Sequence, residues 1–77
     1  MKPTAATTAE LQSLLQKGFQ ALTRGQVHQA GEYCRQVLGL QPDLVEGHFL
    51  VGLVALEMHD RRTALSAFGS VTRLQPS

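Results

Sequence analysis

Hydrophobic residues recur every three or four positions in the first part of the chain, as expected for one face of an amphipathic helix. This spacing predicts a helix over about residues 8–23. Thr7 and Glu10 have the spacing of a capping box at its start, and Gly25 supplies the left-handed residue that ends it. Residues 1–7 are expected to form a flexible leader. The pattern is carried by Leu11, Leu14, Leu15, Phe19 and Leu22.

The same spacing predicts a second helix over about residues 27–40, which Pro42 ends because proline cannot continue a helix. A third helix is predicted to begin at a capping pair formed by Asp43 and Glu46 and to run to about Met58. The inward face of the second helix is expected to carry Val27, Ala30, Cys34, Val37 and Leu38.

A fourth helix is predicted over about residues 61–74, capped by Asp60 and closed by Pro76. The short turns between the four helices indicate that successive helices pack antiparallel. The apolar run 49–56 resembles a strand, but the regular frame of the helices favours a helix there. The inward face of the fourth helix is expected to carry Ala64, Leu65, Phe68, Val71 and Leu74.

An internal repeat relates the two halves of this pattern. Residues 11–42 laid over residues 45–76 share eight identities at an offset of 34 positions. A fixed period of this size is typical of solenoid proteins, in which successive repeats stack side by side. The identical pairs are Gly18/Gly52, Ala21/Ala55, Leu22/Leu56, Ala30/Ala64, Val37/Val71, Leu40/Leu74, Gln41/Gln75 and Pro42/Pro76.

The repeat resembles the tetratricopeptide repeat, a pair of antiparallel helices with small residues and a proline at fixed places. The resemblance implies an all-α fold: two antiparallel helix-turn-helix hairpins stacked as a short right-handed α-solenoid. It implies one domain over residues 8–77, with repeats at about 11–44 and 45–77. The chain departs from the family at its early Trp position, which holds Leu14 and His48. The matching structural positions are Gly18, Ala30 and Pro42, then Gly52, Ala64 and Pro76.

In the family, the first helix of each repeat lines a concave groove that binds partners. Some relatives clamp a C-terminal carboxylate there with basic residues, but this chain has Leu15, Phe19 and Phe49 at those places. An apolar groove favours an amphipathic helix, an extended hydrophobic peptide or a second copy of the chain. The alternative is that its large apolar residues only pack between the repeats. By position the groove residues are Gln12, Leu15, Phe19, Leu22, Thr23, Glu46, Phe49, Leu53, Leu56 and Glu57.

Composition narrows the class of partner. The chain has 77 residues, of which 43% are hydrophobic and 17% charged, with a formal net charge of +1. No basic stripe indicates binding to nucleic acid or to an anionic membrane. No secretory signal and no membrane-spanning stretch stand out, so a cytoplasmic location is expected by default.

The residues that could carry chemistry are few and scattered. His28, His48 and His59 lie in different predicted elements and Cys34 stands alone, which gives no metal-binding pattern. His48 is expected to be a packed ring with one hydrogen bond, and Cys34 a small apolar filler. No phosphate-binding loop or catalytic set is present, so neither a cofactor nor catalysis is expected.

The sequence therefore favours a non-catalytic module for protein–protein interaction or self-association, whose partner is a protein, a peptide or another copy. One alternative is an amino-terminal adaptor of a larger bacterial enzyme, because some sulfotransferases and glycosyltransferases carry such repeats. A second is a structural module that dimerises through its fourth helix or its groove. Two repeats and several helix glycines predict only marginal stability alone, since each interior glycine costs about 1 kcal/mol relative to alanine.

Overall fold

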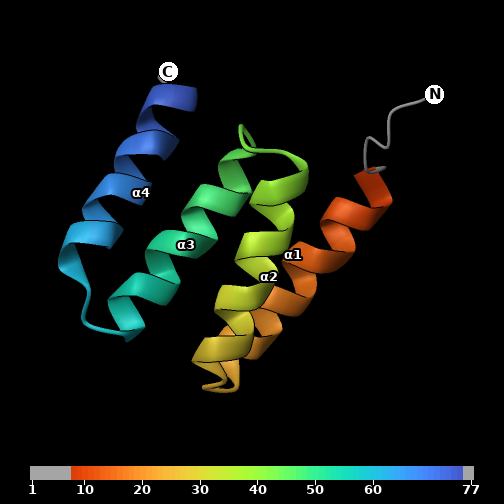
Figure 1. Ribbon diagram of the computed structural model, residues 1–77, viewed down its shortest axis with the longest axis horizontal. Helices are drawn as coiled ribbons and strands as arrows, with labels where there is room; N and C mark the ends of the chain where they lie inside the picture. The colour runs from red at the N-terminus through yellow and green to blue at the C-terminus, as the bar shows by residue number, and fades with distance from the viewer. Residues whose placement is uncertain (1–7, 76–77) are drawn as a thin grey trace.

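Four helices form two antiparallel hairpins in the structure, a computed structural model that describes residues 8–75 (Figure 1). The helix bounds are α1 Thr8–Thr23, α2 Val27–Leu40, α3 Val45–Glu57 and α4 Arg61–Leu74. The all-α prediction and all four predicted helices are confirmed. The expected leader, the capping role of Thr7 and the position of Pro76 lie outside the described residues.

The two hairpins meet through α3. α1 packs against α2, α3 packs against α4, and α3 also contacts both α2 and α1. Within residues 8–75, α4 contacts α3 alone, so α2 and α4 flank α3 without touching each other. This arrangement leaves one face of α3 open between α1 and α4 and another face open between α2 and α4.

The two hairpin turns have the same geometry. Gly25 has a φ of 79° and His59 a φ of 60°, both in the left-handed region. In the first turn, the amides of Gly25 and Gln26 donate to the carbonyls of Leu22 and Ala21 at 3.0 and 2.8 Å. The second turn makes the equivalent bonds, 34 positions later, at the same two distances. This pair of bonds is the Schellman arrangement, which satisfies carbonyls left free at a helix end.

The helix starts differ from one another. Asp60 caps α4 as predicted, because its carboxylate accepts from the backbone amide of Thr63 at 3.1 Å. The prediction that Asp43 caps α3 is wrong. Leu44 is the capping residue and makes no side-chain cap bond. A backbone bond from the Leu44 amide to the Gln41 carbonyl shapes this turn instead, and the helix begins one residue later than an Asp43 cap requires.

The core is aliphatic and lies where α3 meets the first hairpin. Leu50 and Val37 are its largest fully buried side chains. Leu50 sits over Gly18, where an added Cβ would lie 2.5 Å from its Cδ2 atom and 3.3 Å from the Cβ of Tyr33. The small residue is therefore required where α1, α2 and α3 approach one another. The buried cluster consists of Leu11, Leu15, Ala21, Ala30, Cys34, Val37, Leu50 and Val54.

The inward face of α4 is narrower than the sequence predicted. Ala64 is buried as expected, but Leu65 is 71% exposed and Leu74 is 40% exposed. Ala67, which was not predicted, is buried. The physical reason is that α4 packs against one neighbour only. Ala64, Ala67 and the ring of Phe68, which lies over Gly52, contact α3, and the flanking leucines remain in solvent.

Candidate functional site

Three phenylalanine rings from three helices lie in contact on the open face of α3. The ring centroids of Phe19 on α1 and Phe49 on α3 are 6.5 Å apart, at an interplanar angle of 41°. Those of Phe49 and Phe68 on α4 are 5.8 Å apart, at 59°. Tilted ring pairs at such distances are favourable beyond their buried area. Phe49 therefore joins the two hairpins across their open side.

Two exposed leucines extend this cluster along the helices. Leu56 lies two helical turns after Phe49 on the same side of α3, and Leu65 lies one turn before Phe68 on α4. Phe49 is 43% exposed and Leu56 is 48% exposed, while Phe19 and Phe68 are half-buried. We call the set Phe19, Phe49, Leu56, Leu65 and Phe68 the aromatic surface.

The groove residues predicted from the sequence fall into three groups. Leu15 is buried in the core and presents nothing to a partner. Phe19, Leu22 and Leu53 are half-buried, and the Thr23 hydroxyl donates to the Phe19 carbonyl of its own helix at 2.9 Å. The third group is exposed to solvent and consists of Gln12, Thr23, Glu46, Phe49, Leu56 and Glu57.

Sequence reasoning missed the contribution of α4 to this surface. Leu65 was assigned to the inward face of the helix, and that assignment is wrong because its side chain is 71% exposed. The inward position of Phe68 is confirmed, because its ring lies over Gly52 of α3, but its edge also belongs to the exposed cluster. The signal that separates Leu65 was present, because Ala64, Ala67 and Val71 already form a stripe at helical spacing and Leu65 lies about 100° away from Ala64. The sequence could not show that α4 packs against a single helix, α3, among the described residues.

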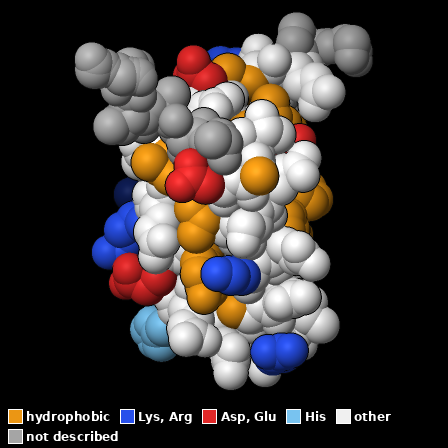
Figure 2. Space-filling model, turned by 90° about the vertical axis from the view of Figure 1, so that its right-hand side faces the viewer, with side chains coloured by type: hydrophobic (Ala, Val, Ile, Leu, Met, Phe, Trp, Pro, Cys, Tyr) orange, Lys and Arg blue, Asp and Glu red, His pale blue; other side chains and the backbone are white. Residues whose placement is uncertain are grey.

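Charges are sorted between the two helices of the second hairpin. Both charged side chains of α3 are acidic, Glu46 in its first turn and Glu57 at its last residue. The charged side chains of α4 are all basic: Arg61, Arg62 and Arg73. On the side shown in Figure 2, by contrast, acidic and basic side chains both surround a narrow strip of hydrophobic atoms. The second hairpin is thus the part of the molecule with a directional charge pattern.

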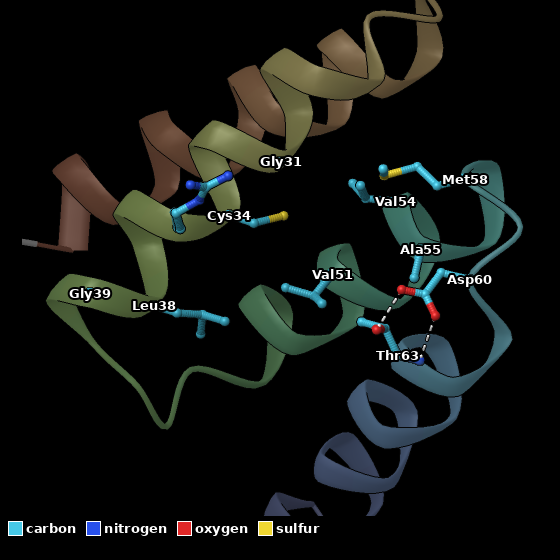
Figure 3. Close-up of a pocket in the computed structure, with 11 residues that line it drawn as sticks. Gly31, Cys34, Leu38, Gly39, Val51, Val54, Ala55, Met58, Asp60 and Thr63 are labelled. Atoms are coloured by element: carbon cyan, nitrogen blue, oxygen red, sulfur yellow. Dashed lines mark hydrogen bonds between the residues drawn. The ribbon is translucent and has the colours of Figure 1, made fainter.

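A cleft, which we call the apolar cleft, lies on the other open face of α3, between α2 and the start of α4 (Figure 3). It has a volume of about 470 Å³. Asp60 and Thr63 at its edge are already bonded to each other, with the Thr63 hydroxyl donating to the carboxylate at 2.6 Å. Arg35 pairs with Glu32 at 3.5 Å on the exposed side of α2. The walls are formed mainly by Gly31, Cys34, Leu38, Val51, Val54 and Met58.

Cys34 is buried at the wall of this cleft. Burial raises the pKa of its thiol to about 11, so the thiol is protonated at neutral pH. A protonated, enclosed thiol is a poor nucleophile and a poor metal ligand. Among the described residues, no group of three His, Cys, Asp or Glu side chains gathers to hold a metal ion.

His48 has the environment expected from the sequence. Its ring is half-buried, and Nε2 donates one hydrogen bond of 2.7 Å to the Pro42 carbonyl. This bond ties the first turn of α3 to the loop before it. His48 is therefore part of the connection between the hairpins, whereas His28 and His59 are exposed.

Comparison of the chain with protein-family models, with curated proteins and with solved structures returns no match. Over residues 8–75, no helix is both long and apolar enough to cross a membrane.

Proposed function

We propose that the chain is a non-catalytic protein-binding module, which uses the aromatic surface to bind an apolar segment of another polypeptide. The observation that carries the proposal is the exposure of Phe49, Leu56 and Leu65 around rings that three different helices hold in contact. Contiguous apolar groups on the surface of a small folded protein are typical of interaction sites. Groups fixed by three helices also lose little freedom on binding.

We also propose that the fold is a two-repeat array of the tetratricopeptide type. The helix bounds support this, because α2 at Val27–Leu40 and α4 at Arg61–Leu74 are related by the sequence offset of 34 positions. The matching turns at Gly25 and His59 support it further. In such an array the aromatic surface would correspond to the concave side, on which the first helix of each hairpin contributes most contacts.

The affinity expected for a partner can be estimated from the apolar side chains that it would bury. Fully burying a Leu or Phe side chain contributes about 1.5–3 kcal/mol. Because Phe49 and Leu56 are already about half-buried, covering them together with Leu65 contributes roughly 3–5 kcal/mol before any loss of translational freedom. That is too little for tight binding, so a partner must add hydrogen bonds or ion pairs, and we expect micromolar or weaker affinity.

A selection of short random peptides displayed against the protein tests the proposal. Peptides that bind the wild type should bind Leu56→Ser at least about tenfold more weakly, because a 1.4 kcal/mol loss corresponds to a factor of ten. Leu40→Ser is the matched control, since Leu40 is 47% exposed but lies on α2, which adds nothing to the aromatic surface. Circular dichroism of both variants should match the wild type. Equal effects of the two substitutions on peptide binding would refute the assignment.

A further inference from the structure

The second hairpin has a charge pattern that bears on which partner fits the aromatic surface. α3 and α4 are antiparallel, so the start of α3 lies at the same end as the finish of α4 (Figure 1). Glu46 and Arg73 therefore share one end of the hairpin. Glu57 shares the other end with Arg61 and Arg62. Each end carries an acidic group on one helix and a basic group on the other.

Two symmetric ways exist to place a second identical hairpin face to face with the first. A two-fold axis perpendicular to the helices puts α3 over α3 and α4 over α4, which sets Glu46 against Glu57 and arginine against arginine. A two-fold axis parallel to the helices puts α3 of each copy over α4 of the other. Glu57 then lies at the same end as Arg61 and Arg62 of the other copy, and Glu46 lies at the same end as Arg73 of the other copy. Only the second arrangement brings helix ends of opposite charge together at both ends of the hairpin.

We propose that a second copy of this chain docks on the aromatic surface, with α3 of each copy lying over α4 of the other. The inference rests on the proposed function, because it uses the same surface and names its partner. In this arrangement the apolar centre is formed by Phe49, Leu56, Leu65 and Phe68 of both copies. The acidic and basic groups form the rim, where complementary charge selects the register more than it adds affinity. A two-fold contact of this kind is self-complementary and closes at two copies.

The size of the contact sets the concentration at which it forms. A helix of about 13 residues is about 20 Å long. Two packed helices about 10 Å apart, each about 10 Å across, present a face about 20 Å wide. The hairpin face is therefore roughly 400 Å² per copy, below the approximately 800 Å² per partner of a stable interface. We accordingly expect a weak dimer that forms at protein concentrations of roughly 0.1–1 mM. Association should weaken in high salt because the rim charges are exposed.

Charge reversal on each helix, followed by mixing, tests the arrangement. The variant Glu46→Lys/Glu57→Lys is basic on both helices of the hairpin, and the variant Arg61→Glu/Arg62→Glu/Arg73→Glu is acidic on both. Sedimentation equilibrium should show wild-type mass rising from 8.4 kDa toward twice that value with concentration. Each variant alone should associate more than tenfold more weakly than the wild type. An equimolar mixture of the two should form a heterodimer at least as tight as the wild-type dimer.

A matched pair of variants separates this docking from general attraction between opposite charges. Glu32→Lys/Asp43→Lys and Lys17→Glu/Arg24→Glu/Arg35→Glu change the charge by the same amounts at exposed positions outside the second hairpin. Each should dimerise like the wild type. A wild-type dimer that survives charge reversal on α3 or α4 would overturn the inference. So would control variants that stop dimerising alone and associate only when mixed, because general charge attraction would then explain the result.

The two proposals fail in different ways. If the wild-type protein stays monomeric to 1 mM and the charge-reversed pair does not associate, the second-copy inference is overturned. The proposed function would still hold if peptides selected against that monomer bind Leu56→Ser more weakly than the wild type. The partner would then be a different polypeptide rather than a second copy. Leu65→Gln gives an independent check on the dimer, because a side chain that is 71% exposed in one copy is not needed for its fold. This variant should weaken the dimer and keep the monomer helical.

Discussion

His59 holds the same left-handed backbone conformation as Gly25, 34 positions earlier in the chain. Their φ angles are 60° and 79°, and each follows the last turn of the first helix in its hairpin. Glycine adopts this conformation freely, whereas a residue with a Cβ atom pays roughly 1–2 kcal/mol. The second turn therefore keeps the geometry of the first with a residue that is less suited to it.

Replacing His59 by glycine should stabilise the protein. We expect His59→Gly to raise the free energy of unfolding by about 0.5–1 kcal/mol, because the removed strain exceeds the added freedom of glycine in the unfolded chain. Urea denaturation followed by circular dichroism measures the change. The reciprocal control, Gly25→Ala, should lower the free energy of unfolding by a similar amount. A loss of stability in His59→Gly would show that the imidazole makes a contact that outweighs the strain.

The cap of α4 should make stability depend on pH in the acid range. Hydrogen bonds from the Thr63 hydroxyl and amide lower the pKa of the Asp60 carboxyl below its ordinary value of 3.8. A carboxyl whose pKa is lower in the folded state stabilises the fold above its unfolded pKa. That contribution is lost as the pH falls through the folded pKa. Asp60→Ala should therefore destabilise the protein at pH 7, and its deficit in melting temperature relative to the wild type should shrink below about pH 4.

The start of α2 lacks the cap that Asp60 gives to α4, so a cap can be introduced there. Gln26 occupies the position that corresponds to Asp60 and makes no side-chain cap bond. Gln26→Asp should add about 1 kcal/mol to the free energy of unfolding at neutral pH, the usual gain from an acidic cap. The gain should fade on acidification, as for Asp60. A gain that persists unchanged at pH 2–3 would contradict a carboxylate cap.

Two helix glycines should respond to alanine in opposite directions. A Cβ atom at Gly52 would lie 2.5 Å from the Cε1 and Cζ atoms of Phe68, so the ring would have to move. Overpacking of this kind costs about 1–3 kcal/mol. At Gly69 no such atom lies within 4 Å of an added Cβ. Gly69→Ala should therefore stabilise the protein by up to about 1 kcal/mol through helix propensity alone, while Gly52→Ala destabilises it.

Thermal unfolding of the two variants beside the wild type measures this contrast. A displaced Phe68 ring should also change the near-ultraviolet circular dichroism of Gly52→Ala, whereas Gly69→Ala should leave that spectrum unchanged. If both variants gain stability, the contact between α3 and α4 is looser than the structure indicates.

The helices were predictable because their signals are local. The signals are the spacing of apolar residues, a left-handed glycine at position 25 and the capping Asp60, and each acts within a few residues. They predicted the ends of every helix to within a residue or two. The error at Asp43 arose because two adjacent residues compete for one helix start, and backbone bonds in the turn decided for Leu44.

The surfaces were less predictable because they depend on which helices lack neighbours. Leu15 and Phe49 have similar character in the sequence, yet one is in the core and the other joins the exposed rings. The apolar cleft follows from the separation of α2 and α4, which no local pattern encodes. The opposite charges of α3 and α4 are readable in the sequence, but their meaning appears only once the two helices are known to lie side by side.

The attachment of α4 on a single flank has a consequence for how the molecule opens. A segment held by one contact stripe is released in smaller fluctuations than one held on several sides. Peeling of α4 would separate Phe68 from Phe49 and take the aromatic surface apart before the first hairpin is disturbed. A molecule that contacts both rings at once would therefore hold α4 against α3, and its binding would be detected as reduced mobility of α4.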